Sequence, residues 1–67
     1  MSATEMHDHL KQLQVERALA LIEGLEASAA YMADLDGEIA ATRVAYVGAA
    51  VTEIASLRAE LSGPQRG

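Results

Sequence analysis

Cysteine, tryptophan and phenylalanine are all absent from this chain, and its only aromatic residues are Tyr31 and Tyr46. Without cysteine, no disulfide and no thiolate metal site can form. A chain of 67 residues has a marginal hydrophobic core, and domains of this size usually need disulfides, a metal or oligomerisation for stability. The missing cysteines therefore leave a metal or oligomerisation as the stabiliser.

Long apolar runs are also missing. The best candidate for a membrane span, residues 19–33, is interrupted by Glu23 and Glu26. The apolar run at residues 44–51 is far shorter than the roughly 20 residues that a transmembrane helix needs. Residues 1–5 carry no basic cluster followed by an apolar run, so no targeting peptide is expected. We expect a cytoplasmic protein without membrane contact.

Positive charge is scarce. Ten acidic residues stand against five lysines and arginines, and the formal net charge is −5. Residues 1–34 alone hold six acidic and two basic side chains. Such a surface repels phosphate, so nucleic-acid binding is not expected. RNA binding by a dimeric hairpin of the ROP type is the weakest alternative, because it rests on architecture alone.

Small and branched aliphatic residues make up most of what is present, and the apolar fraction is 51%. This composition favours an all-α fold with closely packed helices. The first helix is expected at residues 3–31, because Ser2 and Glu5 have the spacing of a capping box. Its apolar face has the helical period and consists of Met6, Leu10, Leu13, Ala18, Leu21, Leu25 and Met32.

A second helix is expected at residues 38–62, before a frayed tail at residues 63–67. Gly63 and Pro64 are a typical helix stop. The expected apolar face consists of Ala40, Val44, Val47, Ala50, Val51, Ile54, Leu57 and Leu61. The opposite face is expected to carry Glu38, Thr42, Ala45, Ala49, Glu53, Ser56 and Glu60.

The connection is predicted at residues 33–37, where Asp34, Asp36 and Gly37 form a turn-like cluster. The prediction is one domain, residues 1–67, folded as an antiparallel two-helix hairpin. The alternative is one long continuous coiled-coil helix, because the two apolar stripes are nearly in phase. At about 1.5 Å per residue, that rod would approach 90 Å, against about 45 Å for the hairpin.

Two helices cannot cover apolar faces as broad as these. The simplest completion is a homodimer of hairpins that forms a four-helix bundle. The residues expected at the oligomer or partner seam are Leu10, Leu13, Leu21, Leu25, Met32, Val44, Val47, Val51, Ile54, Leu57 and Leu61. Gly48, which lies beside Ala41 and Ala55, suggests a tight contact there, since glycine destabilises a helix interior.

No constellation for catalysis is found. His7 and His9 are two residues apart, on different sides of a helix, and cannot share a metal ion. No glutamate has a histidine three residues later, as the centre of a di-iron bundle requires. Glycine-rich phosphate loops and activated nucleophiles are also lacking. We therefore expect no enzymatic activity, no metal and no cofactor.

Several polar and aromatic side chains are candidates for contacts with a partner. Arginines on the apolar faces must pair with acids or extend to solvent, and tyrosine is enriched at binding hot spots. The candidates are Tyr31, Tyr46, Arg17, Arg43, Arg58, Glu16, Glu23 and Glu26. The leading hypothesis is a small assembly or adaptor protein that binds itself and another protein. The alternative is an acidic inhibitor of the phage or plasmid type, suggested by a row formed by Glu16, Glu23 and Glu26.

Overall fold

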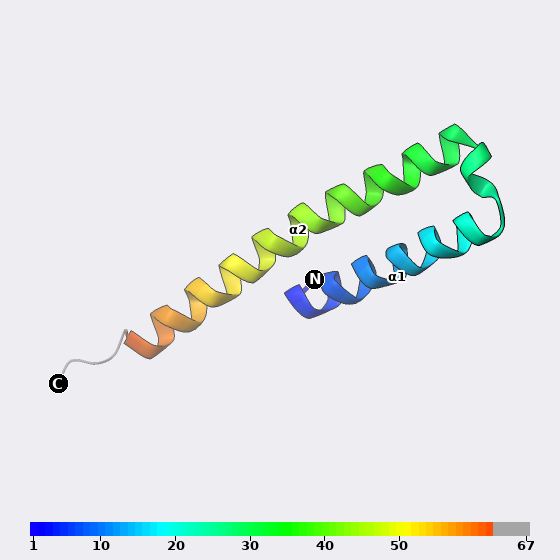
Figure 1. Cartoon of the computed structure of the whole chain (residues 1–67). Coiled ribbons are helices and arrows are strands. Elements are labelled where there is room, and N and C mark those ends of the chain that lie inside the picture. Colours follow the sequence, from blue (N-terminus) through cyan, green and yellow to red (C-terminus); the bar gives the residue numbers. More distant parts are fainter. Residues whose placement is uncertain (63–67) are drawn as a thin grey trace.

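The computed structural model describes residues 1–62, which form helices α1 (Ala3–Ile22), η1 (Leu25–Ala27) and α2 (Ala29–Ser62). Figure 1 shows α1 running back along α2 as an antiparallel hairpin. The predicted all-α hairpin is confirmed, and the alternative of one continuous helix is wrong. The predicted tail at residues 63–67, with its Gly63-Pro64 stop, lies outside the described residues.

The start of α1 has the capping box that the sequence indicates. The Glu5 backbone amide donates to the Ser2 hydroxyl at 3.1 Å, and the Ser2 amide donates to the Glu5 carboxylate at 2.9 Å. These bonds satisfy two amides that the first helical turn would otherwise leave without an acceptor. The hydrogen bonds from Ser2, chiefly the one from its backbone amide, also lower the pKa of Glu5.

The turn lies about ten residues earlier than the sequence predicts. α1 ends at Ile22 rather than residue 31, and α2 begins at Ala29 rather than residue 38. Gly24 has a φ of 78°, and its amide donates to the Leu21 carbonyl at 3.2 Å. Glycine adopts this left-handed conformation without steric cost, which makes it a typical helix terminator. The predicted turn at residues 33–37 is therefore wrong: it lies inside α2.

The earlier turn explains which residues form the core. Leu10 and Leu13 of α1 pack against Leu35 and Ile39 of α2, with Tyr31 at the edge. Leu35 and Ile39 are 5% and 8% exposed, although the sequence places them in or beside a turn. In the part of the chain that the structure describes, only one other apolar residue, Ala20, is buried. The core of the hairpin is therefore very small.

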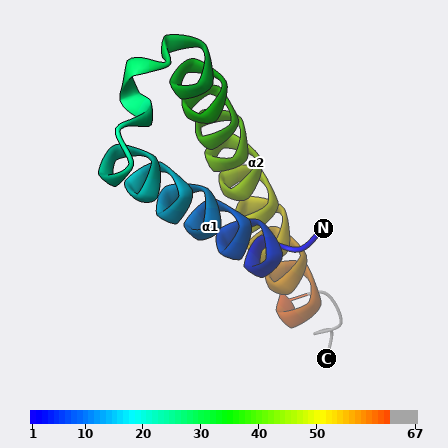
Figure 2. The same cartoon turned by 90° about the vertical axis from the view of Figure 1, so that its right-hand side faces the viewer.

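α2 is 34 residues long and α1 only 20, so the C-terminal part of α2 extends past the start of α1. Figures 1 and 2 show this extension from two directions. The radius of gyration is 17.5 Å, whereas a compact domain of this length would have about 11 Å. The hairpin is thus an elongated body with a large surface for its mass.

Candidate protein-interaction surface

One side of α2 carries residues at alternating spacings of three and four that are all apolar except Arg58. We call this set the outer face of α2; it consists of Ala30, Ala33, Gly37, Ala40, Val44, Val47, Val51, Ile54, Arg58 and Leu61, and every member is exposed. The alternation is the heptad repeat of a coiled coil, in which such residues pack against a second helix. α1 is not the helix that packs against this heptad.

The outer face points away from α1. Leu35, Ile39 and the half-buried Tyr46 mark the side of α2 that contacts α1. At about 100° per residue, the outer face lies on average roughly 130° around the helix from this side. Val44 and Val51 are 73% and 61% exposed as a result. These branched side chains contribute nothing to the core of the hairpin.

The eleven predicted seam residues are divided between three places. Leu10 and Leu13 are buried inside the hairpin, and Met32 is half-buried. Leu21 and Leu25 are exposed next to the turn. The six on α2 are all exposed: Val44, Val47, Val51, Ile54, Leu57 and Leu61. The structure therefore does not bring the predicted seam together as one surface.

The prediction of the polar face of the second helix is partly wrong. The sequence predicts Thr42 and Ala49 on the solvent side, but both are half-buried on the side that faces α1. The carboxylate of Glu53, predicted on the same side, accepts a hydrogen bond from the Ala3 amide at 2.6 Å. The cause is the earlier turn, because packing of Leu35 and Ile39 against α1 orients all of α2.

A second exposed apolar stripe lies on α1. Val15, Leu19 and Ile22 are 58%, 52% and 79% exposed. They follow the i, i+4, i+7 spacing of one helix face, on the opposite side of α1 from Leu13 and Ala20. Their spacing is visible in the sequence, but they are not among the predicted seam residues. We call them the outer stripe of α1.

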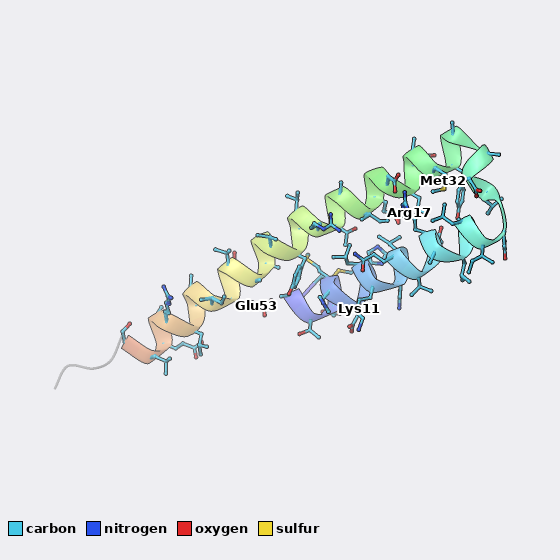
Figure 3. All side chains as sticks on the ribbon, in the orientation of Figure 1. Lys11, Arg17, Met32 and Glu53 are labelled. Carbon is cyan, nitrogen blue, oxygen red and sulfur yellow. The ribbon has the colours of Figure 1, made fainter. Side chains whose placement is uncertain are left out.

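Of the three candidate arginines, Arg17 has a partner in the other helix. Its Nε donates to an Asp36 carboxylate oxygen at 2.7 Å, and Figure 3 shows Arg17 between the helices. This bond and the charge of Asp36 raise the pKa of Arg17. Arg43 and Arg58 are exposed, and neither guanidinium forms an ion pair within residues 1–62. Arg58 is the only charged member of the outer face of α2.

Both tyrosines make contacts within the hairpin. The Tyr31 hydroxyl donates to the Glu16 carboxylate at 2.9 Å, and this bond raises the pKa of Tyr31. The Tyr46 ring lies 5.3 Å from the His7 ring, centroid to centroid. Tyr31 and Tyr46 therefore connect α2 to α1 within the hairpin. Their predicted role in partner contacts stays a prediction.

The predicted acidic row of Glu16, Glu23 and Glu26 does not form on one helix. Glu16 bonds Tyr31, Glu23 caps the end of α1, and Glu26 lies in η1 beyond the left-handed Gly24. Glu16 and Glu23, seven residues apart, lie on the same side of α1. Only Glu26 follows the change of direction at Gly24.

Residues 1–62 form neither a deep cleft nor a cluster of metal ligands. A shallow open depression beside the His7 and Tyr46 rings is also lined by Ala3 and Thr4. No three His, Asp or Glu side chains in this part of the chain are grouped to hold a metal ion. None of its helices combines the length and apolar character needed to cross a membrane. The apolar surfaces of α1 and α2 are thus the main candidates for a functional site.

Comparison with known proteins adds no assignment to these surfaces. No protein-family model matches the chain, and no similar protein was found among curated proteins or solved structures.

Proposed function

We propose that this chain is a small non-enzymatic assembly and adaptor protein, which self-associates through the outer face of α2 and binds another protein through the outer stripe of α1. The observation that carries the proposal is the unbroken exposed heptad on α2 from Ala30 to Leu61. Large exposed apolar patches are typical of protein interaction sites. A heptad repeat in particular is adapted to packing against another helix.

The exposed area supports self-association. The chain exposes 4893 Å², whereas a compact monomer of its mass would expose about 4100 Å². The excess is close to the roughly 800 Å² that each partner buries in a standard specific interface. Within residues 1–62 the hairpin buries only five apolar residues, so pairing would also supply stability that its own core lacks.

The adaptor role rests on the position of the second surface. Val15, Leu19 and Ile22 lie on the side of α1 that faces away from α2. A second copy seated on the outer face of α2 would leave them uncovered. The acidic-inhibitor alternative has the net charge of −5 as support, but Glu16 already bonds Tyr31 and Glu26 lies beyond the turn from Glu16 and Glu23.

Self-association is tested by light scattering coupled to size exclusion, with circular dichroism to verify helicity. The wild type is expected to have a mass that is a multiple of 7.1 kDa. Val47→Asp and Ile54→Asp should lower it to that of one chain, because each places a carboxylate in the interface. Leu19→Asp is the matched control and should leave the mass unchanged. A helical wild type with the mass of one chain would overturn the proposal.

The adaptor role is tested by affinity purification from the native source with three baits. Wild type and a charge-reversed variant of Glu16, Glu23 and Glu26 should capture the same protein, whereas Leu19→Asp should lose it while still self-associating. Loss of that protein with the charge-reversed bait would instead favour the acidic inhibitor. Equal capture by wild type and Leu19→Asp would exclude the outer stripe of α1 as the binding surface.

A further inference from the structure

Self-association through the outer face of α2 allows two orientations of the second copy. We infer that the second copy lies antiparallel, with the two-fold axis passing next to Gly48. This inference depends on the proposed self-association and specifies its geometry. Three features of α2 support it: the position of Arg58, the order of the branched residues, and the small residues beside the heptad.

The charges near the outer face favour the antiparallel orientation. Arg58 occupies a heptad position near the end of α2, whereas Asp34 flanks the heptad near its start. Asp36, on the other flank, is already paired with Arg17. A parallel pair would place Arg58 against Arg58 of the second copy, which is costly in a buried interface. An antiparallel pair places each Arg58 at the acidic end of the other helix. Within residues 1–62, the Arg58 guanidinium forms no ion pair. The antiparallel arrangement would supply a carboxylate near it.

The order of the apolar residues determines the register. With Gly48 next to the axis, Val44 lies opposite Ile54 of the second copy, and Val47 lies opposite Val51. The four branched side chains of each copy, exposed by 53–73%, then form one continuous centre. Arg58 lies opposite Ala40, a small residue that leaves room for its aliphatic stem to extend towards the acidic side chains.

Small residues beside the heptad permit a close approach. Gly48 lies between Ala41 and Ala55 at intervals of seven residues, on one flank of the outer face. An added Cβ at Gly48 would meet no atom within 4 Å in the hairpin, so packing against α1 does not explain the glycine. In the proposed register, Gly48 faces Gly48 of the second copy, and Ala41 faces Ala55 of the second copy. The glycine thus lies where the two backbones are nearest.

The orientation can be measured directly, because a chain without cysteine accepts a single spin label at any introduced cysteine. Two exposed positions on α2 are suitable, Glu60→Cys and Thr52→Cys. In the antiparallel pair, the Glu60 labels are separated by about 33 Å along the helix axis and the Thr52 labels by about 9 Å. In a parallel pair, both positions would give similar short distances. Pulsed electron paramagnetic resonance should therefore show a much longer distance for Glu60→Cys than for Thr52→Cys.

The other outcomes have distinct meanings. A dimer with short distances at both positions would overturn the antiparallel orientation but leave self-association intact. A dimer with long distances at both positions would overturn the register. No intermolecular distance, together with the mass of one chain, would overturn the proposed function itself.

A charge exchange tests the role of Arg58 independently. Arg58→Glu should weaken dimerisation about tenfold, because it removes the positive charge and places a carboxylate in the interface. Adding Asp34→Arg should restore part of the affinity, because the charges are then reversed while Asp34 lies about 9 Å along the axis from the level of Arg58. Sedimentation equilibrium measures both dissociation constants. A double variant that dimerises no better than Arg58→Glu alone would refute the contact with the acidic end.

Discussion

The carboxylate of Glu53 accepts a hydrogen bond of 2.6 Å from the backbone amide of Ala3, fifty residues away in the chain. The bond ties the first residue of α1 to the side of α2, near the labelled Glu53 in Figure 3. A carboxylate at this position also interacts favourably with the positive end of the helix dipole. Beyond Glu53, α2 extends past the start of α1 (Figure 1), and Ile54, Leu57 and Leu61 are more than half exposed.

Replacing Glu53 with alanine should loosen the start of α1. We expect a loss of about 0.5 kcal/mol of local stability, because the bond is exposed to solvent. Hydrogen exchange of the amides at residues 3–6 measures the effect. Glu60→Ala, which removes an equally exposed carboxylate beyond α1, should not change these rates. Equal exchange in wild type and Glu53→Ala would show that the bond does not hold the helix end.

Gly24 and Gly37 should respond in opposite directions to alanine. Gly24 has a φ of 78°, whereas Gly37 is helical, and neither would bring a Cβ within 4 Å of another group. Gly24→Ala should destabilise the hairpin by about 1 kcal/mol, because alanine is strained in the left-handed region. Gly37→Ala should stabilise α2 by up to about 1 kcal/mol through helix propensity. Urea unfolding followed by circular dichroism compares them; stabilisation by Gly24→Ala would contradict the location of the turn.

Truncation of Leu35 should show that this residue belongs to the core. Leu35 is 5% exposed, and Leu35→Ala is expected to cost about 2–4 kcal/mol, as for other buried leucines. In so small a core, that loss should unfold much of the hairpin. Leu19→Ala, at a site that is 52% exposed, is the control and should change stability by less than about 0.5 kcal/mol. Similar unfolding midpoints for the two variants would place Leu35 outside the core.

The capping box should make the start of α1 sensitive to acid. The pKa of Glu5 is lowered in the folded chain, chiefly by the bond from the Ser2 amide. A lowered folded-state pKa means that the stabilisation is present above the unfolded pKa and is lost as the pH falls through the folded pKa. The protection factors of the amides at residues 3–6, which correct for the intrinsic pH dependence of exchange, should therefore fall in acid. Glu5→Gln, which keeps the box without the charge, should show a weaker pH dependence; an identical dependence would exclude Glu5 as the cause.

Local sequence patterns determined the class of the fold and the start of α1. Ser2 and Glu5 form a capping box through contacts three residues apart, and such short-range bonds depend little on the rest of the chain. The helical period of apolar residues likewise holds wherever the helix packs. The heptad on α2 is visible in the sequence too, and most of its large members are predicted seam residues.

The tertiary structure decided where the hairpin turns and which apolar residues it uses. Both Gly24 and the cluster ending at Gly37 are local turn signals, and only packing across the hairpin distinguishes them. Turning at Gly24 brings Leu35 and Ile39 against Leu10 and Leu13. That contact fixes the rotation of α2, and hence leaves Val44, Val47, Val51 and Ile54 exposed on the far side. A helical period shows which residues share a face, but the face that becomes the core depends on contacts between residues distant in the sequence.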